Sequence, residues 1–233
     1  MGTVRVKICG LTSVKGVDAA VKAGASYIGF VFFPKSPRNV EIACAAEFSR
    51  AVPQGIRRVA VTVDAADPVL DEIHRCVGVD MFQLHGGESP DRVADIRNAF
   101  GIPVMKSIGV ADGTDLESAA EYAGVADQLL IDASPRNGME LPGGNGLGFD
   151  WNLVRGRHWP VPWMLAGGLT AGNVAKAVRV TGAGQVDVSS GVERAPGVKD
   201  AELIKAFVSS AHSACRPSSA ACPKPGAAGM ERL

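Results

Sequence analysis

Residues 4–32, VRVKICGLTSVKGVDAAVKAGASYIGFVF, contain one complete strand–helix–strand unit. The segments at its two ends, residues 4–8 and 27–32, are short and mainly apolar, which is typical of strands buried on both faces of a parallel sheet. Between them, apolar residues recur every three or four positions over residues 14–23, which indicates one buried face of a helix. Ser13 stands where a helix N-cap is expected. The stretch therefore predicts a parallel βαβ unit.

The same alternation continues along the chain. Eight strand-like runs occur, at residues 4–8, 27–32, 58–63, 81–84, 103–108, 128–131, 163–165 and 185–188. Helical patterns occur at residues 14–23, 41–51, 68–77, 90–99, 115–122, 171–180 and 200–209, with Asp67, Ser89 and Thr170 at expected N-caps and Gly24 and Gly182 at expected ends. This order predicts an α/β protein with a single (β/α)8 TIM barrel in residues 1–211. Periodicity leaves an open, doubly wound sheet as the alternative.

Two regions depart from the alternation. Residues 133–148 form a long Gly-rich connection after the sixth run, and connections of this length are usually functional lids or disordered. Residues 151–155, which follow, have room for a short helix at most. Residues 212–233 are rich in Ala, Ser, Pro and Gly without a period, so we expect a disordered tail outside the barrel.

Composition narrows the possible partners and the compartment. Lys and Arg number 24 and Asp and Glu also number 24, so net charge gives no reason to expect a nucleic acid or membrane partner. No apolar run reaches the roughly 18–20 residues of a membrane span, and a secretory signal is not expected. The odd number of cysteines without C-x-x-C spacing argues against disulfides and zinc and for a cytoplasmic protein without a metal. The five cysteines are Cys9, Cys44, Cys76, Cys215 and Cys222.

Small residues follow the last two strands, at the carboxyl-terminal rim where barrels of this kind carry their chemistry. Gly167 and Gly168 follow the seventh run, and Ser189, Ser190 and Gly191 follow the eighth. Such residues let backbone N–H groups approach an anion closely, and these two loops often hold a phosphate in TIM barrels. We therefore expect a phosphate-binding site here; ordinary glycine turns are the alternative.

Three further side chains are expected at the same rim. Asp132 ends an apolar run, where desolvation would raise the pKa of its carboxyl and make it a proton donor, although a capping or ion-paired acid fits the position equally well. Cys9 ends the first run, and by composition inert packing is the commoner role of a buried cysteine. His85 follows the fourth run, and its position does not distinguish a binding role from a structural one.

Seven motifs together resemble the phosphoribosylanthranilate isomerase family of tryptophan biosynthesis. They lie in order at the expected strand ends, and the resemblance covers residues 4 to about 209. The motifs are KICGLT (7–12), GFVFFPKSPR (29–38), QLHG (83–86), LID (130–132), GNGLGFDW (144–151), LAGGLT (165–170) and VDVSSGVE (186–193).

The resemblance implies an enzyme that converts N-(5-phosphoribosyl)anthranilate to 1-(2-carboxyphenylamino)-1-deoxyribulose 5-phosphate without a cofactor. In this Amadori rearrangement, an acid protonates the furanose ring oxygen and a base removes the proton from C2. The resemblance implies that Asp132 is the acid and Cys9 the base. Lys7 has the strand parity of Cys9, so both are expected on one side of the strand, where a cation would favour the thiolate.

The resemblance also assigns the substrate contacts. It implies that Arg38 meets the anthranilate carboxylate, that Asp187 lies near the ribose hydroxyls, and that His85 and Gly144 also bind substrate, Gly144 from a mobile loop. Gly10 is interpreted as clearance for the substrate and the backbone. The expected partner is thus a small phosphorylated substrate, and the expected state is a monomer or a homodimer.

Two other functions remain as alternatives. The related sugar-phosphate isomerase of histidine synthesis uses two aspartates, one of them at the end of the first strand, where this chain has Cys9. A barrel that binds phosphate without catalysis is the other alternative. Intact Cys9 and Asp132 argue against it.

Overall fold

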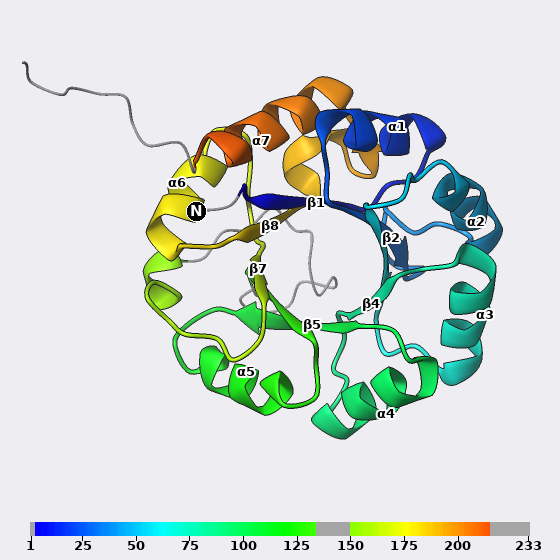
Figure 1. Cartoon of the computed structure of the whole chain (residues 1–233), viewed down its shortest axis with the longest axis horizontal. Coiled ribbons are helices and arrows are strands. Elements are labelled where there is room, and N and C mark those ends of the chain that lie inside the picture. Colours follow the sequence, from blue (N-terminus) through cyan, green and yellow to red (C-terminus); the bar gives the residue numbers. More distant parts are fainter. Residues whose placement is uncertain (1–2, 134–149, 215–233) are drawn as a thin grey trace, which may run out of the picture.

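Eight parallel strands close into a barrel, and the helices form a ring around it (Figure 1). The computed structural model describes residues 3–133 and 150–214. The strands of the barrel are β1 (Arg5–Cys9), β2 (Tyr27–Phe32), β3 (Arg57–Thr62), β4 (Met81–Leu84), β5 (Val104–Val110), β6 (Gln128–Ala133), β7 (Trp163–Leu165) and β8 (Gln185–Val188). They follow one another in sequence order, and β8 pairs with β1, so the predicted TIM barrel is confirmed and the open sheet is excluded.

The outer elements follow the predicted order. They are α1 (Val14–Ala23), α2 (Ile42–Arg50), α3 (Asp67–Val77), α4 (Pro90–Phe100), α5 (Asp115–Ala123), α6 (Val174–Thr181) and α7 (Ala201–Ser213), with the 3-10 turns η1 (Trp151–Leu153) and η2 (Ser190–Val192). In the described part of the connection between β6 and β7, η1 is the only helical turn, as residues 151–155 predicted. Among the described helices, none is long and apolar enough to cross a membrane.

The core has two parts because successive side chains of a strand point to opposite faces. One set of buried side chains joins the outer face of the strands to the helices, with Val6 of β1 and Phe207 of α7 among its members. A separate buried cluster fills the barrel with one residue from each of β2 to β7 and one just after β7. Its members are Tyr27, Val59, Met81, Met105, Leu130, Met164 and Ala166. Burial of both faces explains the mainly apolar strand sequences.

Two of the four expected helix caps are confirmed. Ser13 accepts a hydrogen bond from the backbone N–H of Gly16, and Ser89 accepts one from Arg92. Asp67 is instead the first residue of α3. Thr170 is not a cap, because α6 begins at Val174, later than predicted.

The carboxyl-terminal part of the chain differs from the prediction in two places. A small antiparallel hairpin, β9 (Glu193–Ala195) and β10 (Val198–Lys199), follows β8 and was not expected. Helix α7 continues to Ser213, so residues 212 and 213 belong to the barrel's last helix and not to the tail. Residues 215–233 lie outside the described residues, so the rest of the predicted tail is not tested.

Candidate active site

The predicted acid and base lie at the carboxyl-terminal rim of the barrel. Cys9 is the last residue of β1, and Asp132 is the second-last residue of β6. Both are nearly covered, with 7% and 8% of their surface exposed. In the closed strand order, β7 and β8 separate β6 from β1 on one side and four strands separate them on the other. The two side chains therefore approach the mouth of the barrel from different sides.

Lys7 and Asp187 form a buried ion pair next to Cys9. They are register partners on β1 and β8, and Lys7 Nζ lies 2.9 Å from Asp187 Oδ1. A Cβ atom placed on Gly29 would lie 3.1 Å from Cys9 Sγ and 3.2 Å from Lys7 Nζ. Lys7 and Cys9 thus point to the same side of β1, as their parity predicted.

These neighbours set the protonation of the thiol. Burial raises the pKa of Cys9, the positive charge of Lys7 lowers it, and the negative charge of Asp187 raises it further. The net effect is a raised pKa, so the thiol form is favoured at neutral pH. Burial lowers the pKa of Lys7, but Asp187 and Cys9 outweigh burial and the pKa is raised. Burial is thus the largest effect on the pKa of the thiol, and Asp187 offsets part of the opposing charge of Lys7.

The two carboxylate oxygens of Asp132 have different neighbours. Oδ1 accepts a hydrogen bond of 2.8 Å from the backbone N–H of Ala133, whereas Oδ2 lies 3.5 Å from Nε2 of His85. The other ring nitrogen of His85 lies 2.9 Å from the side-chain amide nitrogen of Gln83. With Gln83 donating, Nδ1 accepts and the proton of a neutral imidazole sits on Nε2, toward Asp132 and Ser107. His85 is therefore a neighbour of the acid.

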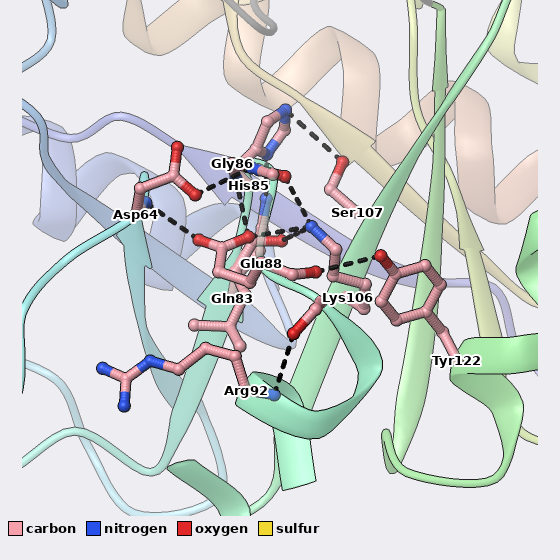
Figure 2. Close-up of polar contacts among 12 residues, drawn as sticks. Asp64, Gln83, His85, Gly86, Glu88, Arg92, Lys106, Ser107 and Tyr122 are labelled. Carbon is pink, nitrogen blue, oxygen red and sulfur yellow. Dashed lines mark hydrogen bonds and ion pairs between the residues drawn. The ribbon is translucent and has the colours of Figure 1, made fainter. Parts of the chain in front are cut away.

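A buried ion pair supports the turn that carries His85 (Figure 2). Lys106 Nζ on β5 lies 2.8 Å from Glu88 Oε2 and donates a 2.6 Å hydrogen bond to the carbonyl of Gly86. Glu88 also accepts from the backbone N–H groups of Asp64 and Gly86. Glu88 and the carbonyl of Gly86 are thus tied to Lys106 of β5, and Glu88 is also tied to Asp64 in the loop after β3. Glu88 was not among the residues predicted from the sequence.

Arg38 faces a carboxylate of the protein itself. Its Nε and Nη2 donate hydrogen bonds of 2.8 Å each to the two oxygens of Glu193, at the start of β9. A Cβ atom on Gly10 would lie 2.9 Å from Arg38 Cδ, so Gly10 leaves room for the side chain of Arg38. Clearance for substrate at Gly10 stays a prediction. Sequence reasoning missed Glu193 and its second partner, Lys199, although the Pro196–Gly197 dipeptide between them is a turn signal.

The two loops of the predicted phosphate site lie against each other. Gly167 and Gly168 have φ angles of +88° and +59°, which favour glycine. A side chain on Gly191 would overlap the carbonyl oxygen of Leu169, so a glycine is needed for the loops to touch. Asn173 stabilises the first loop by accepting from the N–H of Thr170 and donating to the carbonyl of Gly168. Asn173, and not Thr170, is the residue that directly precedes α6.

The second loop is tied to the end of β1. Ser189 Oγ donates a 3.2 Å hydrogen bond to the backbone carbonyl of Cys9, and Lys199 Nζ donates to the backbone carbonyl of Ser189 at 2.9 Å. Ser190 begins the short turn η2. Gly144, the remaining predicted substrate contact, lies outside the described residues together with most of the predicted lid.

Comparison with known proteins gives a consistent result. A family model described as N-(5'phosphoribosyl)anthranilate (PRA) isomerase matches residues 6–210. The chain is 61% identical over 211 residues to the N-(5'-phosphoribosyl)anthranilate isomerase of Cereibacter sphaeroides, covering 91% of this chain and 100% of that protein.

Solved structures agree with the sequence matches. Phosphoribosyl anthranilate isomerase from Thermotoga maritima superposes with a TM-score of 0.81 and 36% identity, covering 89% of this chain and 98% of that one. A structure of such an enzyme in complex with reduced 1-(o-carboxyphenylamino)-1-deoxyribulose 5-phosphate has a TM-score of 0.78 and 35% identity, with the same coverage of 89% and 98%.

Proposed function

The chain belongs to the N-(5'-phosphoribosyl)anthranilate isomerase family, and from that premise we propose how its own residues share the reaction. It converts N-(5-phosphoribosyl)anthranilate to 1-(2-carboxyphenylamino)-1-deoxyribulose 5-phosphate in tryptophan biosynthesis. The rearrangement needs a proton donor at the ring oxygen and a proton acceptor at C2 of the sugar. The observation that carries the proposal is the placement of one acid and one thiol on two separate strands at the same rim.

Asp132 is the proton donor. Because Ala133 N–H occupies Oδ1, the proton to be transferred sits on Oδ2, the oxygen that faces His85 and the barrel mouth. Transfer to the furanose ring oxygen breaks the bond between that oxygen and C1. The ring opens to a hydroxyl at C4 and a protonated imine at C1. The positive imine then acidifies the hydrogen on C2.

Cys9 is the proton acceptor at C2. Its raised pKa means that the thiol must first release its proton to solvent, and the positive imine together with Lys7 favours the thiolate once substrate is bound. The thiolate takes the C2 proton, and the electron pair of the C–H bond moves to give an enolamine. The enolamine gains a proton at C1 and loses the hydroxyl proton at C2. The ketone product forms with no net change in protons.

The phosphate and the anthranilate carboxylate, at the two ends of the substrate, are bound on either side of Cys9 and Asp132. Backbone N–H groups of Gly167, Gly168 and residues 189–191 face the phosphate, since both loops are built from small residues in close contact. Arg38 receives the anthranilate carboxylate through the nitrogens that Glu193 leaves open. Asp187 stays paired with Lys7 and offers its second oxygen to a ribose hydroxyl.

Two conservative variants test the acid and the base. We expect Cys9→Ser and Asp132→Asn each to lower kcat by more than about 100-fold, the low end for general acid–base catalysis. The fluorescence decay of freshly made phosphoribosylanthranilate measures turnover directly. Cys44→Ser, at an exposed cysteine of α2, is the matched control and should retain full activity. Near-normal turnover in either active-site variant refutes the role assigned to that residue.

The cellular setting is also part of the proposal. The described cysteines, Cys9, Cys44 and Cys76, are free thiols, which supports a cytoplasmic location. The balance of 24 basic and 24 acidic residues gives no support for a nucleic acid partner. The protein is a monomer or a homodimer, and sedimentation of the purified chain distinguishes the two.

A further inference from the structure

The guanidinium of Arg38 has two edges, and only one is in use. Nε and Nη2 are paired side-on with both oxygens of Glu193, and the two side chains are 8% and 4% exposed. Among the described residues, Nη1 makes no hydrogen bond. The end-on edge, made by Nη1 and the second hydrogen of Nη2, is therefore the one that remains for a ligand.

Glu193 is shared between two cations. Lys199 Nζ lies 2.6 Å from Glu193 Oε1, and its other two hydrogen bonds go to Oγ and the carbonyl of Ser189 at 3.2 and 2.9 Å. Burial raises the pKa of Glu193, but the hydrogen bond from Arg38 and the charge of Lys199 outweigh it, so the pKa lies below the usual range. With two cations around one carboxylate, the cluster keeps a net positive charge that can attract another carboxylate.

The hairpin of β9 and β10 fixes this cluster in place. A side chain on Gly197, at the hairpin turn, would overlap the carbonyl oxygen of Pro37, so the turn lies directly against the residue before Arg38. Thr12 Oγ1 also donates a 3.1 Å hydrogen bond to the carbonyl of Gly197. The loops after β1, β2 and β8 thus meet at Arg38, and its guanidinium has little freedom to turn.

We propose that Glu193 is the positioning residue that makes this enzyme select a phosphoribosyl arylamine bearing a carboxylate. It holds Arg38 so that the end-on edge faces the aryl carboxylate. Through Lys199 it also connects the Arg38 side chain to Ser189 of the phosphate-binding loop. The distance between the two anion subsites is thereby fixed, and an arylamine without the carboxylate loses the contact. This inference rests on the proposed role of Arg38 toward the anthranilate carboxylate.

Binding of two stable ligands tests the proposal without relying on catalysis. The ligands are reduced 1-(o-carboxyphenylamino)-1-deoxyribulose 5-phosphate and its counterpart without the carboxylate, measured by calorimetry on the full chain. The wild type should bind the first more tightly. In Glu193→Gln and Glu193→Asp this preference should fall at least about tenfold, the loss expected for one misplaced hydrogen bond to a charged group. Affinity for the second ligand should change less than about twofold, because its phosphate contacts remain.

The variants separate positioning from general structural support. Glu193→Asp keeps the charge but shortens the reach, so it should lose the preference while retaining most of the stability. Glu202→Gln, at an exposed residue of α7, is the matched control with wild-type preference. An equal loss of affinity for both ligands in the Glu193 variants shows that Glu193 supports the site without selecting for the carboxylate, and this result overturns the proposal.

Arg38→Met separates this inference from the function on which it rests. A loss of preference in Arg38→Met together with a loss in Glu193→Gln supports the proposal. A loss in Arg38→Met with an unchanged preference in Glu193→Gln overturns the role of Glu193 alone. An unchanged preference in Arg38→Met overturns the carboxylate role of Arg38 itself, and with it this inference.

Discussion

Lys7 and Asp187 face each other as register partners of β1 and β8, with 2.9 Å between Nζ and Oδ1. The pair lies beside the thiol of Cys9, and each member acts on that thiol with an opposite sign. Because burial is the largest effect and Asp187 offsets part of the lysine charge, the pKa of Cys9 lies above its usual range. The resting protonation of Cys9 therefore depends on a contact between residues 180 positions apart.

Substitutions of Lys7 and of Asp187 should shift the pKa of Cys9 in opposite directions. Asp187→Asn removes a negative charge and should lower the pKa of the thiol, whereas Lys7→Met removes a positive charge and should raise it further. Alkylation by iodoacetamide at a series of pH values, followed by mass spectrometry of the peptide that contains Cys9, measures this in the free enzyme. The exposed Cys44 gives an internal control. Shifts of the same sign in both variants contradict this electrostatic account.

The raised pKa of Cys9 should also appear in the kinetics of the wild type. Only the thiolate can accept the C2 proton, and the thiolate fraction rises as pH increases through the raised pKa. We expect the contribution of the thiolate to kcat/KM to keep rising with pH beyond about 8.5, the ordinary pKa of a cysteine, because the pKa of Cys9 is raised. A profile that is already flat from neutral pH upward indicates a thiolate in the resting enzyme and is incompatible with the environment described above.

The sequence predicted what depends on local pattern and on strand order. Strand positions to within one or two residues, the common side of Lys7 and Cys9, and the meeting of the last two loops follow from periodicity and from the geometry of a parallel barrel. The partner of Arg38 could not be predicted in this way, since Glu193 is 155 positions away and lies in the short hairpin of β9 and β10. Likewise, Asp187 was expected at the ribose, and its engagement with Lys7 depends on the register of β1 against β8.

The ion pair of Lys106 and Glu88 should contribute measurably to stability. Both side chains are 3% exposed, so Lys106→Met leaves a buried carboxylate without its cation and should lower the free energy of unfolding by about 3–5 kcal/mol. The double variant with Glu88→Gln should recover part of that loss, because no uncompensated charge remains. Denaturation in urea measures both values.

An exposed pair provides the comparison for that measurement. Lys22 and Asp18 are one helical turn apart on α1, with 75% and 53% of their side chains exposed. Lys22→Met should therefore change the free energy of unfolding by less than about 1 kcal/mol. Similar losses in the buried and exposed variants contradict a special contribution of the buried pair, and so does a double variant less stable than Lys106→Met.

Gly167→Ala should lower kcat by disturbing the orientation of Asp132. Gly167 has a φ of +88°, and a Cβ atom there would lie 2.7 Å from the backbone nitrogen of Ala133, the group that donates to Asp132 Oδ1. Gly182→Ala is the matched control, since Gly182 has a φ of +73° and no heavy atom within 4 Å of an added Cβ.

Backbone strain of about 1–2 kcal/mol is common to both variants, so both should lose stability in urea denaturation. Only Gly167→Ala displaces the N–H that orients Asp132, and only this variant should show a lower kcat at saturating substrate. Equal kcat values in the two variants rule out this link between the glycine and the acid.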